Sequence, residues 1–407
     1  MRSSYPLWLR LVLLTLAILV VVVLGIANYR FAVQEPGGND FLVFWQGARY
    51  WLVEGESPYD EEVALRNQEL IFGRPADFEA GEDAHAFAYP LPAMIFFGPF
   101  GLLPYNIARA IWTTLLEIGL VVLAILSIRI AGWKPSVPTF VLLILFSVFW
   151  YHGFRSVILG QITVLGALLI AGSLLAIKSK SDALAGVLLG LAIIKPQLVY
   201  LLIPFVLIWA LHRKRIKVAA WLLGTIAVLI VGTLLLMPDW PLQWLQRVFA
   251  YSQYTILVSP VSYLAGIVPR FTHQVTLVIS GLLLIYLFYE WAQSMGKSDR
   301  WFQWTAGITL VISILLFFRS GTTNYLILFP SLCIVFGTIQ YRWGKTGTFV
   351  IWLTLIFLMI TLWLLFILTV DGYQEHSIMH VPFAFFIMIG MLWARWWNTS
   401  APRINQV

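Results

Sequence analysis

Hydrophobic and polar positions are arranged along this chain in long blocks. Apolar runs close to the roughly 20 residues needed to cross a bilayer recur from one end to the other, each bounded by charged residues or by Pro and Gly. The runs cover roughly residues 7–29, 105–130, 138–152, 162–177, 183–194, 197–211, 218–237, 274–295, 302–318, 325–341, 347–369 and 378–394. This pattern predicts an all-α polytopic membrane protein, with about 12 transmembrane helices in a single domain over residues 1–407.

Three short pieces depart from simple spans. Residues 91–103 are short and contain proline, so we expect them to lie at the interface or to re-enter the membrane. The runs at 183–194 and 197–211 are also short, and Lys195 followed by Pro196 separates them. Because proline pushes the preceding residue out of the α region, a helix should end at Lys195. Short broken helices are tolerated at membrane depth where they line a cavity or pack in protein.

The composition agrees with a membrane protein, since 60% of the residues are hydrophobic and only 11% are charged, against roughly 25% in soluble domains. The first apolar run is too long for a signal-peptide core, so we interpret it as a retained span. The formal net charge of +7 does not indicate nucleic-acid binding, because the basic residues are dispersed between hydrophobic runs. The single cysteine, Cys333, cannot form an intrachain disulfide.

Charged residues divide unevenly between the two sides of the membrane. One side receives 16 of the 26 Lys and Arg residues in its short loops and tails, and the positive-inside rule makes it the cytoplasmic side, with the N-terminus. The other side receives 12 of the 19 Asp and Glu residues, between residues 31 and 88. Two polar segments on that side, 31–104 and 238–273, contain the Trp, Tyr and Pro typical of interfacial helices. We therefore expect the function on the outer face.

Three basic residues lie in short outer turns, against the positive-inside trend. They are Arg155 in YHGFRSVILGQ, Lys195 in IIKPQ and Arg319 in FFRSGTTNY. Each one alone is compatible with a side chain that reaches lipid headgroups or pairs with a loop acid. Three such residues together would neutralise a phosphate, since arginine offers bidentate geometry and lysine a point charge. A phosphorylated lipid that enters from the membrane plane is therefore the predicted ligand.

The stretch NDFLVFWQGARYWLVEGESPYD, residues 39–60, begins the first outer segment with a carboxylate at the membrane edge. Apolar residues such as Phe44 and Trp45 recur at helical spacing, which places Asn39 or Asp40 as the N-cap of an interfacial helix. Near a low-dielectric boundary, burial raises the pKa of a carboxylate, which can then take a proton from an incoming hydroxyl. The capping and general-base interpretations of Asp40 are compatible.

Other chemical motifs are weak or missing from the sequence. His376 and His380 are four residues apart and could bind a metal beside Glu375 or Asp371, but capping and interface roles suit them better. The sequence contains no G-x-x-x-x-G-K-[ST] loop for ATP and no G-x-S-x-G nucleophile elbow. Any chemistry must therefore draw on a preactivated donor or on a gradient.

Four stretches in series resemble a known family. They are the stretch at 39–60, FAYPLPAMIFFGPFGLLP, ILGQITVLGALLIAGSLLA and DALAGVLLGLAIIKPQLVYLLIPFVL. Their order and spacing over roughly residues 30–212 resemble glycosyltransferase family 87. Its members are polyprenol-phosphate-mannose-dependent mannosyltransferases and related proteins of the C-type (GT-C) integral membrane glycosyltransferase superfamily.

The resemblance implies a GT-C-like fold and an inverting transferase whose site lies on the outer face. It also implies a polyprenyl-phosphate sugar donor, and it gives the role of general base to Asp40. The family's Gly-Gln pair corresponds to Gly160 and Gln161, and its Lys-Pro pair corresponds to Lys195 and Pro196, near the donor phosphate.

The sequence departs from the family at one position of the late outer turn. Many relatives have a histidine there, whereas this sequence has Thr323 and Asn324. Asn324 can hydrogen-bond a sugar hydroxyl but cannot exchange protons. The sugar and acceptor of the characterised members therefore do not transfer directly to this chain.

The sequence predicts a hexosyltransferase of the bacterial cell membrane that moves a sugar, mannose being the best-known case, from a polyprenyl-phosphate donor to a lipid or glycan acceptor. Asp40 is the predicted catalytic residue. The predicted phosphate contacts are Lys195, Arg155 and Arg319, and the predicted substrate contacts are Gln161, Asn324, Tyr89 and Trp45. The rings of Tyr89 and Trp45 suit stacking on sugar faces, but anchoring at the interface suits them better.

Two alternatives stay open from the sequence. A divalent metal is compatible with the chemistry but not required, because Lys and Arg can neutralise the phosphate. A transporter or flippase of a lipid-linked or anionic solute would use the same outer cations as transit sites. Such a protein should have matched broken helices in both halves, whereas the sequence has a broken pair only in the first half.

Overall fold

The computed structural model describes residues 6–35, 38–254, 258–316, 321–372 and 375–399, and nearly all of their regular structure is helical. Six helices are long and apolar enough to cross a membrane, which identifies a multi-pass membrane protein. They are α1 (Leu7–Gln34), α5 (Tyr105–Ala131), α11 (Ile216–Leu236), α14 (Thr272–Ser294), α16 (Phe329–Thr369) and α17 (Pro382–Thr399). A bent pair that meets at 46° could add a seventh crossing, and it consists of α6 (Val137–Phe149) and α7 (Tyr151–Leu159).

Shorter helices fill the remaining predicted runs. They are α8 (Thr163–Lys178), α9 (Asp182–Leu191), α10 (Leu202–His212) and α15 (Asp299–Leu316). Each of the twelve apolar runs thus coincides with helix, and the helix break predicted at the Lys-Pro pair is confirmed. Two 3-10 turns flank it, η3 (Ala192–Ile194) and η4 (Pro196–Leu198), and Lys195 between them has φ −132°. The total of twelve crossings stays a prediction, because among the described residues only these six helices are both long enough and apolar enough to cross a membrane unaided.

The long helix α16 contains two of the predicted runs. Its backbone leaves helical geometry at Gly344, and a Cβ on Gly347 would lie 2.6 Å from the carbonyl oxygen of Ile339. A continuous helix would separate residues eight apart by about 12 Å, so the chain turns back on itself here. The two predicted runs at 325–341 and 347–369 are therefore separate segments.

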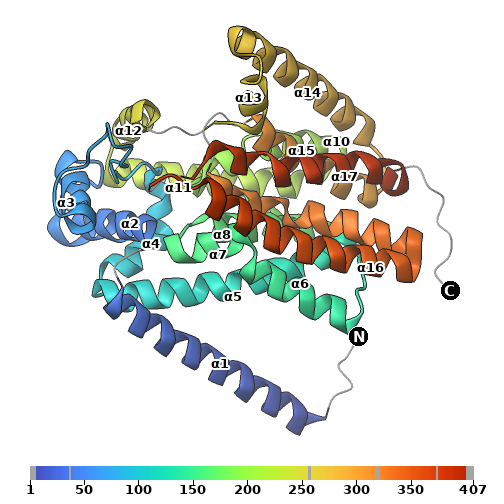
Figure 1. Ribbon diagram of the computed structural model, residues 1–407, viewed down its shortest axis with the longest axis horizontal. Helices are drawn as coiled ribbons and strands as arrows, with labels where there is room; N and C mark the ends of the chain where they lie inside the picture. The colour runs from blue at the N-terminus through green and yellow to red at the C-terminus, as the bar shows by residue number, and fades with distance from the viewer. Residues whose placement is uncertain (1–5, 36–37, 255–257, 317–320, 373–374, 400–407) are drawn as a thin grey trace.

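The first predicted outer segment and α12 (Trp240–Tyr254) of the second lie together at one end of the bundle, which we call the loop end, whereas α13 (Pro260–Ala265) lies beside the start of α14, nearer the middle of the long axis (Figure 1). The first contains α2 (Asn39–Arg49), the π-helix η1 (Tyr50–Glu54), α3 (Glu61–Phe72), η2 (Leu91–Ala93) and α4 (Met94–Gly101). The second contains α12, α13 and η5 (Pro269–Phe271).

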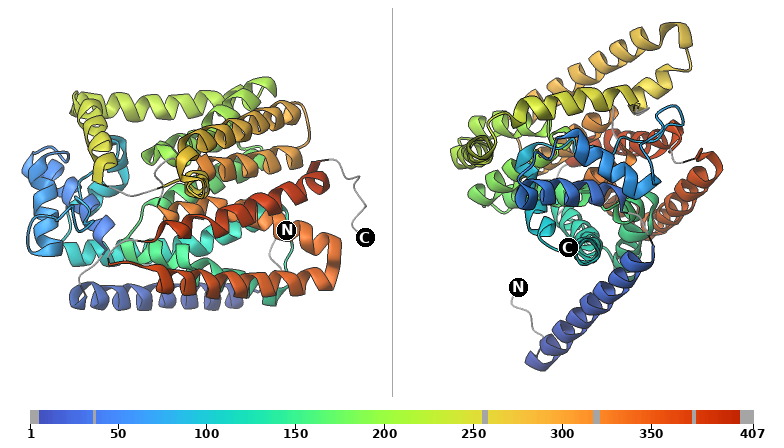
Figure 2. Two further views of the ribbon diagram at one scale, coloured as in Figure 1. Left: turned by 45° about the horizontal axis from the view of Figure 1, so that its top comes forward. Right: turned by 90° about the vertical axis from the view of Figure 1, so that its left-hand side faces the viewer.

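Hydrogen bonds join α12 to the first segment. Ser57 donates to Gln243 over 2.6 Å, and the Trp244 indole donates to the Ala88 carbonyl over 3.1 Å. At the opposite end, which we call the far end, α1 begins and α17 ends (Figures 1 and 2). The interfacial location of these helices stays a prediction, but the helices themselves are present where the sequence predicted them.

The centre of the bundle is built from α15, α8 and the turn η6 (Thr322–Leu328). Every side chain from Phe302 to Leu315 is buried, and so is every residue of η6. A helix that is apolar around its whole circumference belongs inside a protein, and the hydroxyls of Thr309 and Ser313 are satisfied by carbonyls one turn earlier. The turn η6 is therefore held rigidly from all sides. A last 3-10 turn, η7 (Ser377–His380), precedes α17.

Candidate active site

Asp40 lies in the first turn of α2, where the helix dipole favours a carboxylate. The N-cap position is held by Gly38, with φ +67°, and no side chain caps the helix. The prediction that Asn39 or Asp40 is the N-cap is therefore wrong. The physical reason is that the Asp40 carboxylate has a different partner, which comes from the turn between α7 and α8.

That turn begins with Gly160, which lies directly against α2. Gly160 has φ +73°, and a Cβ at this position would lie 2.5 Å from the Cβ of Phe41, so only glycine fits. The indole of Trp112 donates to the Gly160 carbonyl over 2.8 Å and holds the turn in place. This close approach brings the next residue, Gln161, to α2, and its Nε2 donates to Oδ2 of Asp40 over 2.5 Å.

Lys195 reaches the other end of the Gln161 amide from the break between η3 and η4. Its Nζ donates to Oε1 of Gln161 over 3.0 Å and to Oγ1 of Thr163 over 2.5 Å. The Thr163 hydroxyl in turn donates to Oδ1 of Asn324, in η6, over 3.1 Å. Five side chains from separate parts of the chain are thus connected, and we call this set the Asp40 network.

The Asp40 network unites four of the residues predicted from sequence, namely Asp40, Gln161, Lys195 and Asn324. Thr163 was missed. It occupies the first position of an apolar run, where a single hydroxyl gives no signal of its own. Lys195 and Thr163 are buried, whereas Asp40 and Gln161 are only half-buried.

Burial raises the pKa of Asp40 above its ordinary value of 3.8. The hydrogen bond from Gln161 lowers this pKa, Asp83 raises it, and Lys195 and then His85 lower it. The pKa of the Asp40 carboxylate is thus shifted toward the range of a general base. Asp83 and His85 belong to the acidic outer segment, and sequence reasoning did not single them out.

His85 is held in an unusual conformation near Asp40. Its φ is +47°, and three hydrogen bonds keep the segment in place. Asn67 donates to the His85 carbonyl over 2.9 Å, Gln68 donates to the Ala84 carbonyl over 2.7 Å, and the His85 N–H donates to Asp83 over 2.8 Å. Part of the outer segment is thereby fixed within electrostatic range of Asp40.

A second charged cluster lies on the other side of η6. The Glu375 carboxylate accepts from the Thr322 hydroxyl at 2.6 and 2.9 Å, and its Oε2 is 3.9 Å from Nε of Arg155. The Arg155 guanidinium lies over the rings of Tyr151 and Phe366, at 5.7 and 5.2 Å. We call Arg155, Glu375 and Thr322 the Arg155 cluster.

The turn η6 joins the Arg155 cluster to the Asp40 network, because Thr322 precedes Asn324 by two residues. Burial raises the pKa of Glu375, and the charge of Arg155 lowers it. The sequence analysis considered Glu375 only as a metal ligand. Its contact with Thr322 could not be predicted, because the two residues are 53 positions apart in the chain.

The two predicted aromatic residues lie on different sides of α2. Tyr89 meets the edge of Phe44 with ring centroids 4.8 Å apart, and Phe44 is one turn after Asp40 on the same face. Trp45 is about 140° around the helix from Asp40, and its indole donates to the Leu103 carbonyl over 2.9 Å. Tyr89 therefore adjoins the Asp40 network, whereas Trp45 does not.

Arg319, the third predicted phosphate contact, lies outside the described residues. Among the residues that the structure does describe, no group of three or more His, Cys, Asp or Glu side chains could hold a metal ion. His376 caps η7, as its Nδ1 accepts from the Ile378 N–H over 3.2 Å. The capping interpretation of His376 is confirmed.

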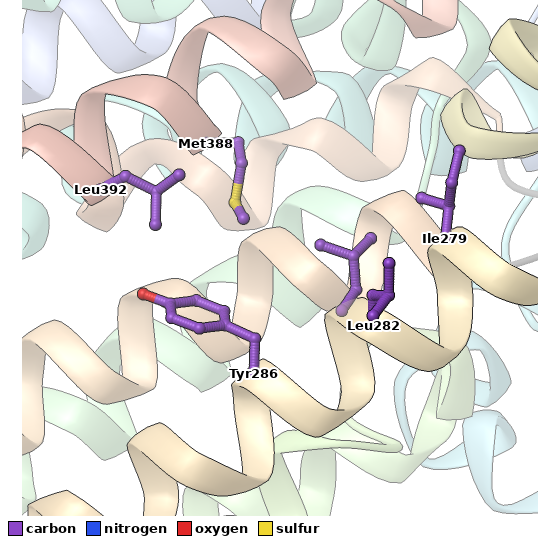
Figure 3. A pocket seen from close by; sticks show the side chains of 6 residues that line it. Ile279, Leu282, Tyr286, Met388 and Leu392 are labelled. Carbon is purple, nitrogen blue, oxygen red and sulfur yellow. The ribbon is translucent and has the colours of Figure 1, made fainter.

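A separate pocket lies between α14 and α17 (Figure 3). Apart from the phenol of Tyr286, its lining is aliphatic or thioether. The lining consists of Ile279, Leu282, Leu283, Tyr286, Met388 and Leu392. Nothing in this lining resembles the donor and acceptor groups of the Asp40 network, so we do not include it in the candidate site.

The family model of glycosyltransferase family 87 matches residues 87–317, which is more than half of the chain. The matched segment includes Gln161, Thr163 and Lys195, while Asp40 precedes it and Asn324 follows it. No curated protein and no solved structure gave a match. By the extent of this match, the chain belongs to glycosyltransferase family 87.

Proposed function

We propose that this protein is an inverting glycosyltransferase that moves a sugar, mannose by family resemblance, from a polyprenyl-phosphate donor to a lipid or glycan acceptor on the outer face of the membrane. The observation that carries the proposal is the Asp40 network. A half-buried carboxylate at the loop end is connected through one amide to a buried ammonium group. Family membership supports the reaction class, and the network supports the choice of residues.

Asp40 acts as the general base in this proposal. The acceptor hydroxyl loses its proton to the Asp40 carboxylate while its oxygen forms a bond to the anomeric carbon of the sugar. The bond between that carbon and the donor phosphate oxygen breaks, and the polyprenyl phosphate leaves from the opposite face. Positioned general bases of this kind accelerate reactions by roughly 10²- to 10⁴-fold.

Fixed cations stabilise the phosphate that leaves. Arg155 is suited to this task, because its side chain is 23% exposed and only a 3.9 Å contact joins it to Glu375. Lys195 and Arg319 are the other phosphate contacts that the sequence predicts. Gln161, Asn324 and Tyr89 are the proposed contacts for sugar hydroxyls. The contacts of Trp45 with Leu103, between α4 and α5, and with Tyr105 of α5 favour its anchoring role.

The arrangement of helices supports access from the lipid. The loop end contains the acidic outer segment and α12, and the charge distribution of the sequence assigns this end to the outer face. A polyprenyl chain would stay in the bilayer while its phosphate reaches the network. The reaction would then need no soluble nucleotide-sugar.

The test is transfer by the purified protein in lipid nanodiscs, supplied with polyprenyl-phosphate mannose, other polyprenyl-phosphate sugars and a panel of lipid and glycan acceptors. Asp40→Asn should reduce transfer by at least about 10²-fold, since amide cannot take the proton. Asp60→Asn is the matched control, because Asp60 is exposed on the same outer segment. Unchanged transfer by Asp40→Asn would exclude Asp40 as the base.

Two further arms separate the alternatives. The same protein in sealed vesicles should form a glycosidic product; movement of the lipid-linked sugar across the bilayer without any product would instead support a flippase. Transfer should survive a metal chelator if Lys and Arg supply the neutralising charge. Loss of transfer that added Mg²⁺ or Mn²⁺ restores would contradict that assignment.

A further inference from the structure

The Asp40 network has a fixed hydrogen-bond direction. A lysine ammonium group can only donate, so Gln161 must turn its Oε1 toward Lys195, 3.0 Å away. The amide nitrogen of Gln161 then faces Asp40, which as a carboxylate can only accept, over 2.5 Å. Both neighbours of Gln161 therefore demand the same orientation of its amide.

The second branch follows the same rule. Thr163 accepts from Lys195 over 2.5 Å, which leaves its one hydroxyl hydrogen for another acceptor. Oδ1 of Asn324 is 3.1 Å away, closer than Oε1 of Gln161 at 3.4 Å. The oxygen of Asn324 is thus turned toward Thr163, and its NH₂ group is turned away from Thr163.

We propose that Lys195 and Thr163 are positioning residues that set the direction of the network, Lys195 orienting Gln161 toward Asp40 and Thr163 orienting Asn324 in η6. This inference rests on the proposed function, because it takes Asp40 as the base. It adds Thr163 to the site and gives Lys195 a role that differs from direct binding of the donor phosphate.

Burial distinguishes these two roles of Lys195. The residue is only 3% exposed, and side-chain oxygens already use two of its three donors. The side chain of Arg155 is more exposed, at 23%, and its contact with Glu375 is long, at 3.9 Å, compared with the 2.5 and 3.0 Å hydrogen bonds of Lys195. The cation placed to meet a phosphate is therefore Arg155, and the cation placed to orient the network is Lys195.

Removal of Lys195 has a specific chemical consequence. Oε1 of Gln161 loses its partner, so the hydrogen bond from the Gln161 amide to the Asp40 carboxylate is less firmly held, and the ammonium charge that lowers the pKa of Asp40 is lost as well. The acid limb of the pH–activity profile should then move to higher pH. The other groups that act on Asp40 are Asp83 and His85, with the phenol of Tyr89 beside them, and they are unchanged in these variants.

The experiment measures kcat across pH and the apparent KM for polyprenyl-phosphate mannose in the full-length protein. Lys195→Met and Gln161→Leu should each move the acid limb up by about one pH unit, with donor KM changed by less than about two-fold. The double variant should move the acid limb by less than the sum of the two single shifts, because both changes act on the same hydrogen bond and only Lys195→Met also removes a charge that lowers the pKa of Asp40. Lys178→Met is the matched control, since Lys178 donates to backbone carbonyls of Arg129 and Ile130.

Thr163 is tested by two variants of graded severity. Thr163→Val should lower kcat several-fold, and Thr163→Ser should restore it, because serine retains the hydroxyl. Equal loss in both variants would overturn the assignment of Thr163 and leave only a packing role for its methyl group.

Several results would overturn the inference for Lys195. An unmoved acid limb with a donor KM raised more than about ten-fold would make Lys195 a phosphate ligand. If Lys195→Met does not fold, the isosteric Gln161→Glu variant replaces it, and its second carboxylate should also raise the acid limb. Asp40→Asn in the same assay separates failure of this inference from failure of the proposed function. Full activity of Asp40→Asn would exclude Asp40 as the base. An inactive Asp40→Asn together with an unmoved acid limb in Gln161→Glu would overturn only the positioning role of Lys195.

Discussion

Charged side chains in the candidate site are paired differently from those at the far end of the bundle and from the direct pair of Arg74 with Glu82 in the outer segment. At the far end, Arg395 donates directly to Glu290 over 2.7 Å, and Arg215 donates directly to Asp182 over 3.0 Å. In the candidate site, Gln161 stands between Asp40 and Lys195, and 3.9 Å separates Arg155 from Glu375. In a direct ion pair the two charges neutralise each other, whereas charged groups that are held apart can still interact with a ligand.

The helix geometry explains why the two kinds of pair are far apart. The helix α8 begins beside the Asp40 network at Thr163, and its 16 residues span about 24 Å. Asp182 and Arg215 follow the ends of α8 and α10, which both lead away from the network. From this difference we infer that the far-end pairs serve stability, and we propose that the separated groups of the candidate site serve chemistry. Four substitutions test that division.

Asp40→Asn should reduce activity more than any of the other substitutions, and it should increase the stability of the fold. Transfer should fall by at least about 10²-fold. Because the folded-state pKa of Asp40 is raised, the folded protein binds the proton more tightly than the unfolded chain does. Wild-type stability is therefore lost as pH rises from 3.8 through the raised pKa, and asparagine removes that loss.

Thermal unfolding of wild type and Asp40→Asn across pH provides the check. The advantage of the variant should grow with pH inside that window and stay constant above it. Wild-type activity should fall in the same window as pH decreases, since protonated Asp40 cannot act as a base. An advantage that is independent of pH would contradict the assignment of a raised pKa.

Arg395→Met should have the largest effect on stability, at the far end. Glu290 has only 1% of its side chain exposed, so removal of its partner leaves a buried charge and should cost about 3 kcal/mol. The kcat of the protein that remains folded should not change. Combination with Glu290→Met should recover much of the stability, as measured by chemical or thermal unfolding in detergent; a double variant as unstable as the single one would argue against charge burial.

Glu375→Gln should have a smaller effect, limited to donor binding. The glutamine oxygen can still accept from Thr322, but the negative charge near Arg155 is gone. The apparent donor KM should fall by about two- to five-fold, in keeping with a partly exposed pair. Glu290→Gln serves as the far-end control and should leave donor KM unchanged. A higher donor KM in Glu375→Gln would show that the carboxylate itself contacts the donor.

Trp45→Phe should have the smallest effect. It removes the indole hydrogen bond to the Leu103 carbonyl and keeps an aromatic ring, which should lower stability by about 1 kcal/mol. Donor and acceptor KM should stay within about two-fold of wild type. A selective rise in either KM, without loss of stability, would return Trp45 to the substrate site.

Much of this structure could be predicted from sequence, because the blocks of apolar residues mark helices independently of their packing. The break at Lys195 was also readable, since proline acts on its neighbour locally. The capping prediction at Asn39 and Asp40 failed for a tertiary reason. Capping propensity depends on local sequence, whereas the partner of Asp40 is Gln161, 121 residues away.

The residues that sequence reasoning missed have long-range partners as well. Thr163 looks like part of a span until Lys195 and Asn324 are placed beside it. Glu375 looks like a loop acid until Thr322 is found 53 residues before it. The presence of an acidic residue and a basic residue in two different outer turns, such as Glu375 and Arg155, was a usable signal. The sequence alone does not say which acidic residue pairs with which basic one.

The contact between Gly160 and Phe41 has a consequence for how such an enzyme diversifies. The backbone of Gly160 packs so closely against the Cβ of Phe41 that no side chain fits between them. The path of the backbone therefore fixes the distance between Asp40 and Gln161. The parts of the outer segments away from this contact are not under that constraint, so we expect their length and sequence to vary more easily. Under the proposed function, such changes would alter the acceptor while the distance between Asp40 and Gln161 is kept.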